Sequence, residues 1–197
     1  MTDLALDITD QQSLLAVDHD RLRAAIARVL TAERIASAEI SLALVDDAEI
    51  QRVNREFLGH DYATDVISFR LNDEAAEIRV AGVGASPPPD AKTFPDAGAP
   101  YLAGGRDART PATHFERSTR SAPPRLEGEL IVSTETALRE AAAHGWTPAD
   151  ELLLYVVHGL LHLCGYDDLT DEARPVMRAR EREVLAGWQL VPTGLEA

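Results

Sequence analysis

Two histidines and an aspartate toward the carboxyl end of the chain have a spacing typical of a metal site. His158 and His162 are four residues apart within the apolar stretch LLLYVVHGLLHL, and Asp168 follows Gly165 by three residues. Residues i and i+4 of a helix share one face about 6 Å apart, so both imidazoles can reach one ion. A glycine after the helix lets the chain turn back toward that ion. Two nitrogens and one oxygen suit zinc with a position left for water or substrate, so we predict a zinc site at His158, His162 and Asp168.

The same histidine spacing has a simpler interpretation. Two histidines in a protein core can also be satisfied by hydrogen bonds to backbone carbonyls. The glycine, the carboxylate and the buried setting together favour the metal. A zinc protease of the H-E-x-x-H type has a glutamate general base after the first histidine, whereas this chain has Gly159 there. The sequence therefore argues against peptide hydrolysis by that mechanism and leaves the catalytic and substrate-binding residues unassigned.

The element that carries the histidines is predicted to be a buried helix. Thr147 can cap it, Pro148 suits its first position, Asp150 completes a capping box, and Gly165 is a natural stop. Leucines and valines cover nearly every face between these signals. A helix that is apolar all round is buried, so its histidines need a partner.

The rest of the pattern alternates strands and helices. Strands are predicted at 4–9, 38–46, 65–69 and 128–133, and helices at 18–34, 47–59, 134–145 and 170–185, besides the helix after Thr147. Such a mixture implies a sheet with helices packed on it. We expect an α+β fold, a small mixed sheet of about four strands covered by about five helices, in a single domain of residues 1–197.

One internal segment differs in composition. Residues 73–125 are rich in Pro, Gly, Ala, Asp and Arg, with seven acidic and seven basic residues, and are predicted to be a disordered or loosely ordered insertion. The net charge of −14 therefore belongs to the flanking parts, and it argues against a simple nucleic-acid-binding module. The single cysteine and the lack of a signal peptide or a long apolar run favour a soluble cytoplasmic protein without membrane contact.

Three blocks of the chain resemble the YbeY-type endoribonucleases, also described as ribosomal RNA maturation factors. HGLLHLCGYDD is similar to the family signature H-G-x-L-H-L-x-G-Y-D-H, NREFLGHDYATDVISF to N-x-x-Y-R-x-K-D-x-P-T-D-V-L-S-F, and GELIVS to G-D-I-x-I-S. The resemblance implies a zinc-dependent, single-strand-specific endoribonuclease that acts on precursor ribosomal RNA in 16S maturation and ribosome biogenesis. It also implies contact with the small ribosomal subunit and with an assembly GTPase, and it implies that a metal-activated water or a polarised phosphate provides the chemistry.

The chain departs from the family pattern at the third metal ligand and in the second block. Asp168 stands where the family has its third histidine, Leu58 where it has an arginine, and His60 where it has a lysine. A carboxylate can ligate zinc, but its charge makes the metal a weaker Lewis acid, and Leu58 cannot bind a phosphate. Two other hypotheses therefore stay open: a non-catalytic ribosome assembly factor with a structural zinc, and a metallohydrolase with a non-RNA substrate.

A few single residues have competing interpretations. Asp167 can orient a ligand or stabilise a turn; Thr64, Asp65 and Ser68 can line a cleft or form turns; and Cys164 is expected to pack in the core. His19, His114 and His144 are expected at the surface. Arginines and glutamates, including Arg178 and Glu181, alternate along the last helix, which is typical of a solvated face.

Overall fold

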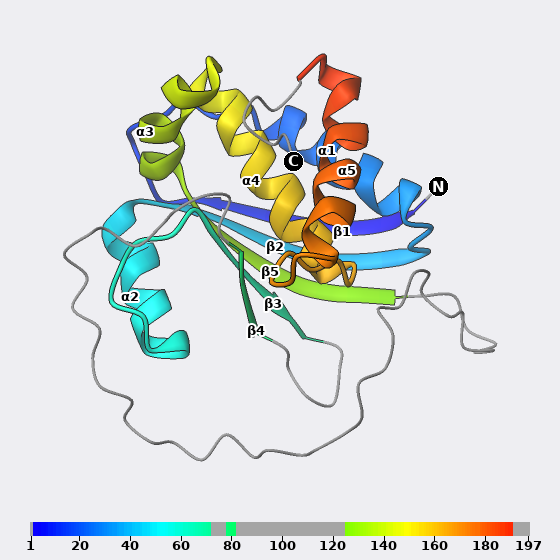
Figure 1. Cartoon of the computed structure of the whole chain (residues 1–197), viewed down its shortest axis with the longest axis horizontal. Helices are drawn as coiled ribbons and strands as arrows, with labels where there is room; N and C mark the ends of the chain where they lie inside the picture. Colours follow the sequence, from blue (N-terminus) through cyan, green and yellow to red (C-terminus); the bar gives the residue numbers. More distant parts are fainter. Residues whose placement is uncertain (1, 72–77, 82–124, 191–197) are drawn as a thin grey trace.

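A five-stranded mixed sheet organises the chain (Figure 1). The computed structural model describes residues 2–71, 78–81 and 125–190. Its strands are β1 (Asp3–Asp10), β2 (Ser37–Val45), β3 (Val66–Arg70), β4 (Ile78–Ala81) and β5 (Arg125–Ser133), in the order β1-β2-β5-β3-β4. Strands β1, β2 and β5 run parallel, whereas β3 pairs antiparallel with both β5 and β4. The expected α+β fold with a mixed sheet is therefore confirmed.

The sheet has one more strand than the expected four. The additional strand, β4, lies at an edge and falls within the range 73–125 that the sequence marks as an insertion. Arg125, the last residue of that range, is the first residue of β5. Apart from β4 and Arg125, the insertion lies outside the described residues.

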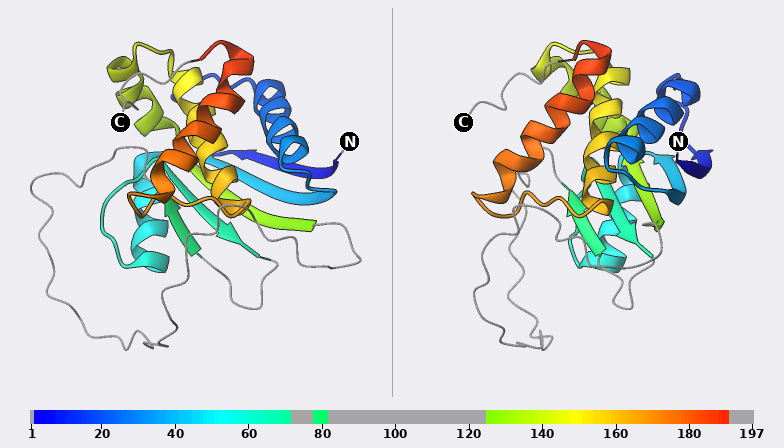
Figure 2. Two further views of the ribbon diagram at one scale, coloured as in Figure 1. Left: turned by 45° about the vertical axis from the view of Figure 1, so that its right-hand side comes forward. Right: turned by 90° about the vertical axis from the view of Figure 1, so that its right-hand side faces the viewer.

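Helices cover the two faces of the sheet unequally. Figures 1 and 2 show α1 (His19–Ala32), α3 (Thr134–His144), α4 (Pro148–Leu163) and α5 (Ala173–Leu185) on one side and α2 (Asp47–Leu58) on the other. Because side chains alternate along a strand, β5 contributes side chains to the clusters on both faces of the sheet. Leu130 and Val132 belong to the large core under α1 and α4, whereas Ile131 packs against the smaller cluster under α2.

The central helix of the large core is α4, as the sequence predicts. Every residue from Glu151 to Leu163 is buried. Thr147 and Asp150 form the predicted capping box around Pro148, and Gly165 follows the helix with a φ of +100°. That φ lies in the left-handed region that glycine tolerates best, so the chain can reverse at this point. The helix thus ends where the predicted metal ligands require a turn.

No helix among the described residues is long and apolar enough to cross a membrane.

Candidate metal centre

His158 and His162 point their Nε2 atoms at one another from the buried face of α4. The two Nε2 atoms are 3.1 Å apart. The side chains are 0% and 2% exposed, so bulk water cannot satisfy them. The helical spacing read from the sequence therefore does bring both rings to one point.

The turn after α4 carries Asp168 back to the same point. Its Oδ2 lies 3.8 Å from Nε2 of His158, and its Oδ1 lies 3.6 Å from Nε2 of His162. Asp167 stabilises this turn, because its Oδ1 accepts hydrogen bonds from the backbone N–H groups of Asp168 (2.8 Å) and Leu169 (3.1 Å). This agrees with the turn-stabilising interpretation of Asp167. Among the described residues, His158, His162 and Asp168 form the group whose ligand atoms lie within 4.8 Å of one another.

The hydrogen bonds behind the two rings show where their protons lie. Nδ1 of His162 is 3.0 Å from the backbone carbonyl oxygen of Tyr166, and Nδ1 of His158 is 2.5 Å from Oε1 of Glu181. A carbonyl oxygen or a carboxylate can only accept, so we assign the proton of each neutral ring to Nδ1. Each Nε2 then carries a lone pair. Two lone pairs that face one another, beside a carboxylate, form a site for a cation.

The environment of His162 favours the neutral ring that metals require. Burial, and then the neighbouring His158 ring, lower the pKa of His162 to about 4, while Asp168 and the Tyr166 carbonyl act in the opposite direction. A proton therefore competes poorly for this nitrogen at neutral pH. The three predicted ligands lie together, and burial favours the neutral ring of His162, while the bound metal itself stays a prediction.

Glu181 corrects one expectation from the sequence. The charge pattern of the last helix indicated a solvated face, but the Glu181 side chain is 0% exposed and contacts His158. Its position in an apolar stripe was the available signal. Met177, Glu181, Val184 and Leu185 are the buried residues of α5, and their spacing of four, seven and eight residues from Met177 places them on one helix face.

The other residues with competing interpretations take part in hydrogen bonds or core packing. Thr64, Asp65 and Ser68 are all buried. Oδ1 of Asp65 accepts hydrogen bonds from the Thr64 hydroxyl (2.9 Å) and from the Val66 backbone N–H (2.8 Å), which supports the turn interpretation. Cys164 packs against the large core, and burial raises the pKa of its thiol to about 12.

The positions that depart from the family's second block lie on and beside α2. Leu58 is the last residue of α2 and packs against the cluster that contains Ile50 and Phe69. This cluster and α4 lie on opposite faces of the sheet (Figure 1). His60 is exposed and its ring stacks on that of Tyr62 with 5.5 Å between centroids.

The remaining predicted surface histidines differ from one another. His19 is exposed as expected, and His114 lies outside the described residues. His144 is half-buried instead, because its Nδ1 lies 2.8 Å from Oε2 of the buried Glu151.

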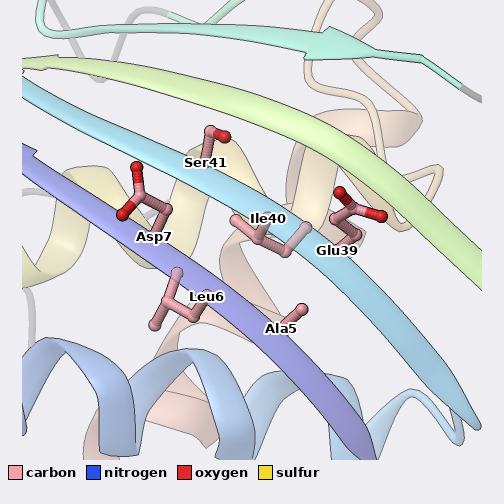
Figure 3. A pocket seen from close by; sticks show the side chains of 6 residues that line it. All are labelled: Ala5, Leu6, Asp7, Glu39, Ile40 and Ser41. Carbon is pink, nitrogen blue, oxygen red and sulfur yellow. The ribbon is translucent and has the colours of Figure 1, made fainter.

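A hollow of about 400 Å³ lies elsewhere, along β1 and β2 (Figure 3). Its lining includes Asp7, Glu39 and Ser41. Glu39 and Ser41 alternate with Ile40 and Leu42, which point into the core shared with α4, so the acidic groups face away from the histidines. The hollow and the candidate metal centre are therefore separate features.

Comparison with known proteins gives a consistent family. The family model described as "Endoribonuclease YbeY" matches residues 7–189. Proteins named endoribonuclease YbeY from Bacillus licheniformis and Moorella thermoacetica are each 34% identical, over 95% and 91% of this chain and 96% and 94% of their own lengths. The solution structure of TM1509 from Thermotoga maritima aligns with a TM-score of 0.49 at 20% identity, covering 94% of this chain and 91% of that one.

Proposed function

This chain belongs to the endoribonuclease YbeY family, and from that premise we propose that it is a zinc-dependent endoribonuclease that cleaves single-stranded RNA. The proposed substrate is precursor ribosomal RNA, cleaved during 16S maturation. The proposed setting is the cytoplasm, in contact with the small ribosomal subunit and an assembly GTPase. The chemistry is assigned to His158, His162 and Asp168.

The convergence of three side chains is the observation that carries this proposal. The Nε2 atoms of His158 and His162 lie 3.1 Å apart, and the carboxylate of Asp168 places Oδ2 3.8 Å from the first and Oδ1 3.6 Å from the second. In a tetrahedral site with bonds of about 2.0 to 2.2 Å, ligand atoms are separated by about 3.3 to 3.6 Å. Two imidazole nitrogens suit zinc better than magnesium or calcium, which prefer oxygen ligands. The residues present therefore fit a zinc ion.

The chain itself would hold, orient and shield the reacting group. A zinc ion in this place supplies Lewis acidity toward a phosphodiester. His158 and His162 are closed off by the core, whereas the side chain of Asp168 is 11% exposed. Substrate access is thus expected on the side of the Asp168 turn, with water excluded from the α4 side.

The charge of the chain determines how RNA would bind. A net charge of −14 repels a polyanion over long range. Binding would then depend on the metal and on local contacts, so we expect brief encounters with single strands in place of a stable RNA complex. This is consistent with an enzyme more than with an RNA-binding module.

The proposal is tested by metal content together with RNA cleavage. Purified wild type is expected to hold about one zinc per chain by elemental analysis and to cut a single-stranded RNA while sparing a duplex of the same sequence. His158→Ala and Asp168→Ala should lose both zinc and cleavage. His19→Ala is the matched control, since that histidine is exposed and lies outside the group. A metal-free wild type, or cleavage that survives His158→Ala, would contradict the proposal.

The departures at Asp168 and Leu58 favour one alternative, a non-catalytic assembly factor with a structural zinc. On this hypothesis the wild type binds zinc, and removing the zinc lowers its melting temperature, but no RNA is cleaved. The Asp168→His, Leu58→Arg double variant separates the two hypotheses. Cleavage by the double variant alone would show that this chain has kept the metal and lost the activity.

A further inference from the structure

The carboxylate of Glu181 is buried directly behind His158. Its side chain is 0% exposed, and its Oε1 lies 2.5 Å from Nδ1 of His158. Burial of a charged group costs several kcal/mol unless it is paired and hydrogen-bonded. Glu181 nevertheless lies on the buried face of α5, among Met177, Val184 and Leu185. A leucine at this position would be sufficient for packing. A function for the carboxylate is therefore needed.

The contact determines both the tautomer and the ring orientation of His158. The carboxylate accepts the Nδ1 proton, so the Nε2 lone pair is left for the ion. Because the hydrogen bond comes from a different helix, it also fixes rotation of the ring about its χ angles. Hydrogen bonds of this kind from a carboxylate to a metal-binding histidine typically raise metal affinity about 10- to 100-fold.

Arg178 provides charge compensation for the carboxylate. Its Nη1 lies 3.8 Å from Oε2 of Glu181, one helical turn away on α5, and its side chain is 17% exposed. The second carboxylate oxygen thus faces a cation while the first faces His158. The contacts from Arg178 through Glu181 to the neutral His158 ring lead from the surface of α5 to the candidate metal centre.

We propose that Glu181 is a positioning residue that prepares His158 for metal binding, with Arg178 balancing its charge. This inference rests on the metal site proposed above and adds α5 to it. It implies that the metal affinity of α4 depends on a residue that never touches the ion.

Two substitutions separate this role from simple packing. Glu181→Gln keeps the shape and one acceptor oxygen but removes the charge, and Glu181→Met keeps the volume but removes the acceptor. Glu183→Gln is the matched control, because it removes the same charge from the same helix at a side chain that is 70% exposed. Zinc affinity of each full-length protein is measured by competition with a chromophoric chelator, with Zn²⁺ as the only added ligand.

The expected order of zinc affinity is wild type, equal to Glu183→Gln, then Glu181→Gln about 10-fold weaker, then Glu181→Met about 100-fold weaker. A second measurement does not depend on metal. The ¹⁵N chemical shifts of the His158 ring, recorded by NMR on metal-free protein, should report Nδ1–H in the wild type and a mixture of tautomers in Glu181→Met. A purely structural role for Glu181 would change stability and leave these shifts unaltered.

The outcomes are distinguishable from failure of the proposed function. Unchanged zinc affinity in both folded Glu181 variants, or an unchanged His158 tautomer in Glu181→Met, would overturn the inference alone. A wild type that binds no zinc would overturn the metal site and this inference with it. If Glu181→Met does not fold, the affinity and ¹⁵N shifts of Glu181→Gln decide, and a Gln variant indistinguishable from wild type refutes the role of the charge.

Discussion

Gly159 of α4 lies directly against Val66 of β3. A Cβ atom at position 159 would meet Cγ2 of Val66 at 2.8 Å and Cδ2 of Leu130 at 3.0 Å. The helix therefore rests on the sheet by its backbone at the residue that follows the first histidine. The glutamate of an H-E-x-x-H protease has no space at this position, which gives a steric reason for the absence of that motif.

We predict that Gly159→Ala lowers the free energy of unfolding by about 1 to 2 kcal/mol. Overpacking costs about 1 to 3 kcal/mol, and replacing a helical glycine with alanine returns up to about 1 kcal/mol. Urea unfolding followed by circular dichroism measures the difference. Ala24→Gly, at an exposed position of α1, is the control for helix propensity alone. A Gly159→Ala variant more stable than wild type would show that α4 can move away from the sheet.

Asp47 links the first turns of α2 and α3, and this contact predicts a pH dependence. Although burial acts in the opposite direction, hydrogen bonds from Ser133, Thr136 and Arg139 lower the pKa of Asp47. Its Oδ1 accepts from the hydroxyls of Ser133 (2.5 Å) and Thr136 (2.6 Å), and its Oδ2 accepts from Arg139 (2.6 Å). We predict that Asp47→Asn costs about 1.5 to 3 kcal/mol of stability at pH 7, the usual size for hydrogen bonds to a charged group.

The sign of the pH effect follows from the lowered pKa. The ionised carboxylate stabilises the folded state fully above the unfolded-state pKa of about 3.9 and loses that contribution as pH falls through the lower folded-state pKa. The stability difference between wild type and Asp47→Asn should therefore be constant from pH 7 to about 4.5 and shrink at lower pH. Glu56→Gln, exposed on the same helix, should show little effect at any pH. A difference that grows on acidification would contradict the assignment.

The sequence was sufficient for most of the fold because its signals there are local. Asp18, Asp46, Ser133 and Thr147 each cap a helix through a side-chain hydrogen bond, and Gly59 and Gly145 end α2 and α3 with positive φ. The strand β4 is different. It is four residues long, lies at the sheet edge, and belongs to a segment whose composition favours turns, so its pairing with β3 carries no local signal.

The residues of the candidate site also differ in whether a local sequence pattern could identify them. His158, His162 and Asp168 lie within eleven residues, so helix geometry and one glycine could place them together. Glu181 contacts His158 across 23 residues and two helices. Which residue of α5 contacts His158 depends on how α5 packs on α4. The Tyr166 carbonyl that binds His162 is invisible to residue-type patterns, because every residue has a backbone carbonyl.

A second buried carboxylate, Glu151 of α4, yields a prediction that is independent of the metal. Glu151 is 0% exposed, and its Oε2 lies 2.8 Å from Nδ1 of His144, whose side chain is 20% exposed. Removing the hydrogen-bond partner of a buried polar group typically costs about 1 to 3 kcal/mol. We predict that His144→Ala destabilises the protein by about 2 kcal/mol in thermal or urea unfolding. His19→Ala breaks an exposed histidine–aspartate contact of 3.4 Å with Asp10 and should cost less than about 1 kcal/mol. Equal losses of stability in the two variants would show that the contact between Glu151 and His144 does not stabilise the fold.

The last prediction concerns the charge of Asp168, the proposed third ligand. Asp168 contributes a negative charge where the family pattern has a neutral imidazole, and a zinc ion with less donated charge is the stronger Lewis acid. We therefore expect Asp168→His to keep one zinc per chain, to cleave single-stranded RNA several-fold faster than wild type at pH 7, and to reach its maximal rate at lower pH. Asp171→His is the matched control, since its side chain is 92% exposed and lies in the same turn region. Zinc content by elemental analysis and a pH series of cleavage rates measure both effects. If Asp168→His loses its zinc or cleaves more slowly than both wild type and the control, the turn after α4 is built for the shorter carboxylate, and Asp168 has a role that a histidine cannot fill.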